Sequence, residues 1–201
     1  MMFGTQLLHK GARPYPDHLA ACLGDAAPEQ LSVIGRGELP LAGSLALLCS
    51  AKAPAGILLA VHDLAQQWRY GAQTIISGFH APAEQEAFTV LLRGPGRVVY
   101  CPARGLPRRL PAEWQTPLAE GRLTLLSPFA DTVRRGTKAT AVYRNRIVAA
   151  LADAVLIAYA HPDSSSAHLA QAALTWGKPV YTLPHPANAH LRRLGLANLP
   201  P

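Results

Sequence analysis

Apolar residues occur along the chain in two alternating kinds of segment. Continuous runs such as LALLCS (45–50) and AVLIAYA (154–160) are typical of strands buried on both faces of a parallel sheet. Between such runs apolar positions recur at helical spacing, as at Ile57, Val61 and Leu64. Strands that alternate with helices in this way predict an α/β domain with a mostly parallel sheet.

The same pattern gives the expected elements and the domain organisation. Strands are predicted over residues 31–35, 45–50, 73–77, 97–101, 122–127, 154–160 and 179–183, and helices over 54–71, 82–93, 111–120, 141–153 and 167–176. Residues 1–30, which prolines interrupt, are expected to form an N-terminal arm with one short helix. No linker or repeat divides residues 31–201, so these are expected to form a single domain.

Basic residues outnumber acidic ones, and most of them are arginines. The formal net charge is +7, and only four of the 19 basic residues are lysines. Arginine suits bidentate contacts with phosphate and stacking on bases. The charge therefore favours a nucleic acid or a phosphorylated ligand, although a GC-rich genome would produce the same bias toward arginine.

The cysteines and the hydropathy indicate where the protein resides. Cys22, Cys49 and Cys101 contain no CxxC pair, which argues for a reducing compartment rather than a disulfide framework. The N-terminal residues lack the long apolar region of a secretion signal, and no apolar stretch reaches the ~18 residues that span a bilayer. We expect a cytoplasmic protein without membrane contact.

The predicted sheet also indicates where a ligand binds. In open parallel sheets, ligands bind beyond the carboxyl ends of the strands, where the strand order reverses. Three loops with small residues lead from that edge: SAKAP, SGFHAP and HPDSSS. A basic loop and the helix after it are expected to bring five cations to the same crevice: Arg134, Arg135, Lys138, Arg144 and Arg146.

Motifs for catalysis, nucleotide binding and metal binding are missing. No GxGxxG, GxxxxGK[ST] or G-x-S-x-G sequence is present, which argues against a dinucleotide enzyme, a phosphate-loop NTPase and an α/β-hydrolase. The histidine pairs His161/His168 and His185/His190 do not have the spacing of a zinc site. No catalytic residue, metal ion or cofactor is therefore expected.

Several segments in order resemble the Rossmann-like domain of the DNA-processing protein A family (DprA, also called Smf). The match runs from the YP of residues 15–16 to about residue 195. SGFHAPAEQEAF corresponds to the family pattern SGxAxGxDxxAH, and VLIAYAHPDSSS to a VLVVEA strand followed by a Ser-Gly-rich loop. The most specific segment is RNRIVAALAD, which corresponds to RNRI(I/V)AGLSD.

This resemblance implies a doubly wound, Rossmann-like sheet with helices on both faces, and it implies a function. Members of the family bind single-stranded DNA in a basic pocket, form dimers and help to load the RecA recombinase, without chemistry on the DNA. By position, the implied pocket residues are Ser50, Ser77, Gly78, Arg144, Asn145, Arg146, Ser165 and Ser166.

The chain departs from the family pattern at the first of the three loops. Where the family has a GSR sequence, the chain has Cys49, Ser50 and Ala51, and Lys52 is expected to replace part of the lost charge. Glu84 and Phe88 stand at the family's aspartate and histidine. The alternative is therefore a nucleotide-binding sensor or a hydrolase like the LOG-type phosphoribohydrolases, although the PGGxGTxxE loop of those enzymes is absent.

Overall fold

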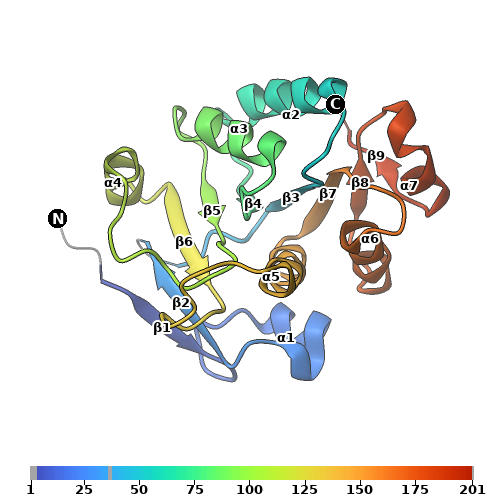
Figure 1. Cartoon of the computed structure of the whole chain (residues 1–201). Helices are drawn as coiled ribbons and strands as arrows, with labels where there is room; N and C mark the ends of the chain where they lie inside the picture. Colours follow the sequence, from blue (N-terminus) through green and yellow to red (C-terminus); the bar gives the residue numbers. More distant parts are fainter. Residues whose placement is uncertain (1–3, 36–37, 201) are drawn as a thin grey trace.

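Nine strands form one sheet within residues 4–35 and 38–200, the part of the chain that the computed structural model describes (Figure 1). Their spatial order is β1-β2-β6-β5-β4-β3-β7-β8-β9. The seven strands from β6 to β9 in that order are parallel, whereas β2 is antiparallel to β6 and β1 to β2. The strands are β1 (Gln6–His9), β2 (Gln30–Ile34), β3 (Leu45–Cys49), β4 (Ile75–Ser77), β5 (Val98–Tyr100), β6 (Leu123–Ser127), β7 (Ala154–Tyr159), β8 (Val180–Thr182) and β9 (Ala197–Asn198).

Helices cover both faces of this sheet. Figure 1 shows α2 and α3 on one side and α1, α5 and α6 on the other. The helices are α1 (Asp17–Leu23), α2 (Ala55–Trp68), α3 (Pro82–Leu91), α4 (Ala112–Ala119), α5 (Lys138–Leu151), α6 (Ser165–Thr175) and α7 (Ala189–Arg193). The predicted doubly wound, Rossmann-like α/β fold is therefore confirmed, and each strand and helix expected after residue 30 is present.

The central strand β3 shows why a continuous apolar run was needed. All five of its residues are buried. Leu45 and Leu47 join the apolar cluster under α2 and α3, while Ala46 and Leu48 join the cluster under α1, α5 and α6. Successive side chains of a strand point to opposite faces, so a strand covered by helices on both sides must be apolar at every position.

The first 30 residues are more regular than the sequence indicated. β1 pairs with β2, with Gln6 opposite Val33 and His9 opposite Gln30, so residues expected to be irregular extend the sheet. The expected short helix is α1. Only Leu8 of β1 is buried, which left no apolar pattern to identify the strand. Residues 1–3 of the predicted arm lie outside the described residues, and a domain boundary at residue 30 stays a prediction.

Helix α5 begins three residues before its predicted start at residue 141. Thr137 caps it, because the Thr137 Oγ1 accepts a hydrogen bond from the Thr140 backbone N–H at 3.2 Å, and the Thr140 Oγ1 accepts one from the Thr137 N–H at 2.8 Å. Arg144 and Arg146 are therefore the seventh and ninth residues of the helix. They lie in its second and third turns.

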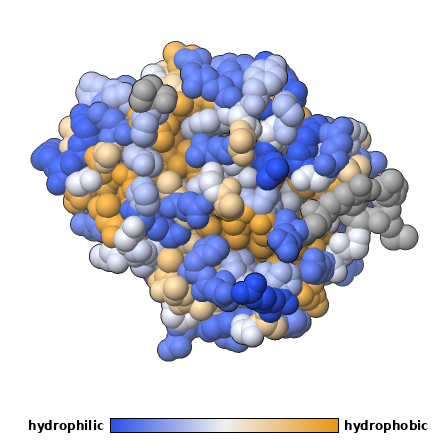
Figure 2. Space-filling view, turned by 180° about the vertical axis from the view of Figure 1, so that it is seen from behind, coloured by the Kyte–Doolittle hydropathy of each residue, from blue (hydrophilic) through white to orange (hydrophobic). Residues whose placement is uncertain are grey.

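No helix within the described ranges is long and apolar enough to cross a bilayer. On the face that Figure 2 shows, hydrophobic residues form patches that hydrophilic residues interrupt.

Candidate functional site

The strand order reverses between β3 and β7, at the centre of the sheet. From β3 the chain continues through α2 to its neighbour β4, whereas β7 leads through α6 to β8 on the other side. The loops after β4 and β7 leave the carboxyl edge near this point, and each contains a non-glycine residue with positive φ, Phe79 at 46° and Asp163 at 57°. Backbone strain of this kind clusters at ligand sites, so this edge of the sheet is the candidate site.

Glu84 ties two of the loops together. Its Oε1 accepts a hydrogen bond from the Cys49 backbone N–H at 2.8 Å, and its Oε2 accepts bonds from the N–H groups of His80 at 2.9 Å and Ala81 at 3.3 Å. Only 3% of Glu84 is exposed. Burial raises the pKa of Glu84, and the nearby charge of Arg144 opposes that rise. The carboxyl group therefore holds the end of β3 and the loop after β4 together inside the protein, and it is not accessible to a ligand.

Arg144 reaches this edge from α5, and it does so across Gly78. Its Nη1 donates a hydrogen bond to the Cys101 carbonyl oxygen at 2.9 Å, while its Nε has no partner among the described residues. A Cβ added to Gly78 would lie 0.9 Å from the Arg144 Nη1. Only a glycine lets the guanidinium group pass here. Arg144 is 3% exposed, so it also holds the loops after β4 and β5 in place.

An open pocket of about 560 Å³ lies above this contact. It has four cationic or titratable nitrogen side chains, two aromatic rings and no acidic residue among its described lining residues. We call this site pocket 1. Its lining residues are Gly78, Phe79, His80, Gln85, Tyr100, Pro102, Ala103, Arg104, Gly136, Thr137, Lys138, Ala141 and Arg144. Its charge favours an anion, and its volume is that of small-molecule and nucleotide sites.

Stacked aromatic rings form one wall of pocket 1. Phe88 stacks on Phe79 with ring centroids 4.5 Å apart and on Tyr100 at 5.5 Å. Trp114 contacts Tyr100 edge-on at 5.1 Å. Phe88, which stands at the family's histidine, thus supports from behind the two rings that line the pocket. A rigid π surface beside cations suits a nucleobase next to its phosphate.

The structure separates the predicted basic patch into two parts. Asn145, Arg146 and Ser165 line a smaller pocket of about 180 Å³ between α5 and α6, together with Val142, His168, Leu169 and Ala172, which we call pocket 2. Arg144 and Lys138 line pocket 1. Two residues on a helix differ in direction by about 200°, so Arg144 and Arg146 cannot face one crevice. The expectation that they share one is wrong.

The other residues predicted from the sequence lie at the edge but outside both pockets. Ser77 is buried, and its Oγ accepts a hydrogen bond from the Phe79 N–H at 3.1 Å, which stabilises the turn after β4. Ser166 is also buried, within the first turn of α6. Four residues lie elsewhere on the loops: Ser50 is half-buried, and Lys52, Arg134 and Arg135 are exposed. Their roles as phosphate ligands stay predictions.

Sequence reasoning missed Arg104, which lines pocket 1 from the loop after β5. The three loops expected at the ligand edge do not include this one, although β5 is parallel to β4 and ends at the same side. The signal was present in its sequence, ARGLPRR, which is basic and follows the strand directly.

The two buried cysteines at the carboxyl edge of the sheet, Cys49 and Cys101, are unreactive near neutral pH. Burial raises the pKa of the Cys49 and Cys101 thiols to about 12. A thiol is a nucleophile and a metal ligand only as the thiolate, so both side chains act as small apolar groups near neutral pH. Within residues 4–35 and 38–200 no three His, Cys, Asp or Glu side chains are grouped so that they could hold a metal ion.

Comparison with known proteins identifies the family of the chain. The sequence model of the DNA recombination-mediator protein A family matches residues 6–197. The chain belongs to this family. Its resemblance to DprA is thereby confirmed over almost its whole length. No curated protein matches the sequence directly.

Solved structures share the fold at low sequence identity. DNA processing protein A (DprA) from Streptococcus pneumoniae superposes with a TM-score of 0.79 at 21% identity, over 98% of this chain and 71% of the other. The DprA from Helicobacter pylori, whose structure was described for its single-stranded DNA binding mode, gives 0.75 at 21% identity over 98% and 90%. A molybdenum cofactor binding protein from Rippkaea orientalis gives 0.54 at 13% identity over 78% and 88%.

Proposed function

We propose that this DprA-family protein binds single-stranded DNA in pocket 1, as a mediator of DNA processing and recombination and without chemistry on the DNA. The observation that carries the proposal is the combination of an aromatic wall and unpaired cations in one open pocket. The half-buried Tyr100 offers its ring to a base, the buried Phe79 lines the pocket beside it, and Arg104 and Lys138 are exposed next to them. Stacking platforms next to basic grooves bind single strands with little sequence preference.

The chemistry of the lining supports binding rather than catalysis. No Asp or Glu is among the described residues that line pocket 1, and the buried carboxyl group of Glu84 is engaged by three backbone N–H groups. Hydrolysis of a glycosidic bond typically uses two carboxyl groups with access to the substrate. The proposal therefore assigns the pocket to recognition.

The wider role follows from the family resemblance. A homodimer, a contact with a RecA-type recombinase, a part in the uptake of transforming DNA and a cytoplasmic location are included in the proposal on that basis. The three free cysteines support a reducing compartment.

Fluorescence anisotropy with labelled oligo-dT tests the pocket. Tyr100→Leu should weaken binding by about 5- to 150-fold, because base stacking contributes ~1–3 kcal/mol per base, while Tyr100→Phe should keep the affinity. Arg104→Ala and Lys138→Ala should each lower the salt dependence of binding by ~0.7 in log–log slope, since each removes one phosphate contact. The exposed Arg97, which precedes β5 at the opposite edge, provides the matched control Arg97→Ala.

A mononucleotide is the second candidate ligand, because the volume of pocket 1 would hold one. The same titration with dTMP and AMP separates the two. Tight mononucleotide binding without affinity for the oligomer would contradict DNA binding and support the nucleotide sensor. Equal binding by Tyr100→Leu and the unmodified protein would show that pocket 1 is not the site.

A further inference from the structure

Two loops next to pocket 1 are fixed side by side. The loop after β5 (residues 101–111) and the loop after β6 (residues 128–137) are joined by a hydrogen bond from the Gly105 N–H to the Val133 carbonyl oxygen at 3.0 Å. The Ser127 Oγ donates another bond to the Arg104 carbonyl oxygen at 2.7 Å. A Cβ added at Gly105 would lie 2.7 Å from the Ala130 oxygen, so the backbones touch. The loops therefore act as one surface.

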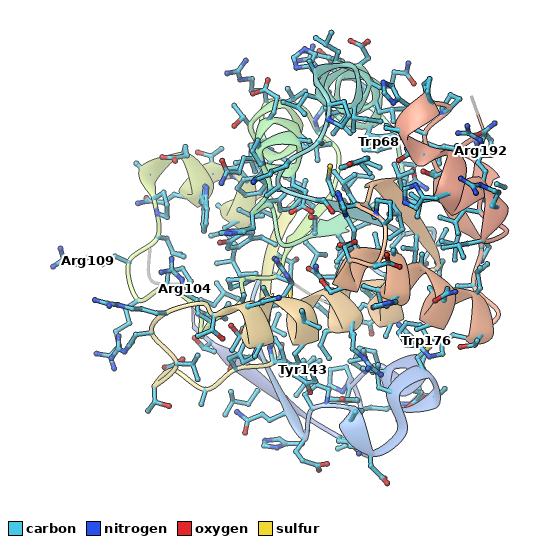
Figure 3. All side chains as sticks on the ribbon, turned by 45° about the vertical axis from the view of Figure 1, so that its right-hand side comes forward. Trp68, Arg104, Arg109, Tyr143, Trp176 and Arg192 are labelled. Carbon is cyan, nitrogen blue, oxygen red and sulfur yellow. The ribbon has the colours of Figure 1, made fainter. Side chains whose placement is uncertain are left out.

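This surface concentrates positive charge. Six of the 19 lysines and arginines lie on it or directly after it, and all six are exposed: Arg104, Arg108, Arg109, Arg134, Arg135 and Lys138, which we call the basic tract. The two loops contain a single acidic residue, Asp131. Across the described residues, none of the six cationic groups takes part in an ion pair or a side-chain hydrogen bond. Figure 3 shows Arg104 and Arg109 at the same end of the molecule, with Arg109 projecting outward.

The basic tract is continuous with pocket 1. Arg104 and Lys138 belong to both, so an anion held in the pocket lies at one end of the tract. Several free cations on one surface that adjoins the pocket match the chemistry of a nucleic-acid backbone, with one phosphate per nucleotide. A single compact anion would leave Arg108, Arg109, Arg134 and Arg135 without a partner.

We propose that single-stranded DNA bound in pocket 1 continues along the basic tract, with phosphates on Arg108, Arg109, Arg134 and Arg135. The inference rests on the proposed function of pocket 1. It makes the loop after β5 a second DNA-binding loop, and it places there the charge that the loop after β3 lacks at Ala51. The site then extends over several nucleotides, and affinity depends on the length of the strand.

The length of the oligonucleotide distinguishes binding along the basic tract from binding in pocket 1 alone. The test variant is Arg108→Ala/Arg109→Ala, and the matched control is Arg93→Ala/Arg97→Ala, which removes the same charge from exposed arginines between α3 and β5, at the other edge of the sheet. Both are titrated by anisotropy with dT4 and dT20 between 0.05 and 1 M salt, and their melting temperatures are compared. Two lost phosphate contacts should lower the log–log salt slope for dT20 by ~1.4. The factor by which the unmodified protein binds dT20 more tightly than the variant should then be roughly 25 times larger at 0.1 M than at 1 M salt. Binding of dT4 should change no more than in the control.

The possible results distinguish the two proposals. If the unmodified protein binds neither oligomer, the proposed function itself fails. If it binds both and the tract variant matches the control with dT20, only the tract is wrong. Tighter binding of a 20-base-pair duplex than of dT20, with the same loss in the tract variant, would overturn the assignment of the tract to a single strand.

Discussion

Replacing Gly78 by alanine should displace the guanidinium group of Arg144. The new Cβ would lie 0.9 Å from the Nη1 and 1.7 Å from the Cζ of Arg144, so the group must retreat by about 2.5 Å to restore an ordinary contact of 3.4 Å. That movement breaks the 2.9 Å hydrogen bond to the Cys101 carbonyl oxygen. It also separates a buried charge from the pocket that it lines.

The cost can be worked out from the lost bond. Hydrogen bonds to charged groups contribute ~1.5–3 kcal/mol, and the Cys101 carbonyl is left without this partner. A domain of this size loses about 2–4 °C in melting temperature per kcal/mol, so we expect a decrease of about 3–12 °C. In the Arg144→Ala background the same substitution should be neutral or stabilise by up to ~1 kcal/mol, because alanine restricts the unfolded chain more than glycine does.

Urea denaturation of the four proteins measures the coupling between the two positions. The double-mutant cycle should give an interaction free energy of ~1.5–4 kcal/mol, the difference between the cost with Arg144 and the small gain without it. If Gly78→Ala costs as much without Arg144 as with it, the glycine is required for another reason and the account of this contact is refuted. Equal affinity of Gly78→Ala and the unmodified protein for oligo-dT would show that Arg144 does not shape pocket 1.

Three further effects should follow from the same edge of the sheet. The pKa of Cys49 and of Cys101 is raised to about 12 from 9.0, so the stability they contribute is complete below pH ~9 and is lost as the pH rises toward 12. At pH 10 the loss should be ~1.4 kcal/mol per thiol, and pH-dependent urea titrations should show a smaller loss in Cys101→Ala. Thr137→Ala should lower the free energy of unfolding by ~1 kcal/mol through the lost cap of α5, and Thr137→Ser, which keeps the hydroxyl, should recover most of it. Glu84→Gln should cost ~1–3 kcal/mol in the same measurement, because an amide NH₂ must then face a backbone N–H of either Cys49 or His80; an unchanged stability would mean that these bonds are dispensable.

The regular part of the fold was predictable because burial on both faces leaves a strong pattern. β3 and β7 are apolar at nearly every position, since helices cover both sides of them. β1 and β9 could not be identified in this way: one residue of β1 is buried, and none of β9. These edge strands are held by backbone pairing to their neighbours, to which side chains contribute little pattern.

The candidate site was predictable in part. Parallel strand order brings Gly78, Lys138 and Arg144 together, as expected from the loops at the carboxyl edge. The direction of the Arg146 side chain was not predictable, because it depends on how α5 is rotated about its axis. The alternation of strands and helices in the sequence does not determine that rotation. The aromatic wall was hidden for another reason: Phe88 and Trp114 come from two helices, and only tertiary packing places them behind Tyr100.

The contact between Gly78 and Arg144 has an evolutionary consequence. Because a side chain at position 78 and an arginine at position 144 exclude each other, selection acts on the pair rather than on either residue. We expect the two positions to covary among related chains, with a larger residue at 78 only where 144 is short. The arginine would then be retained for the architecture of the loops as well as for a ligand. Changes of ligand preference within the lineage should appear first in the exposed loops after β3 and β5, where substitution leaves this pair intact.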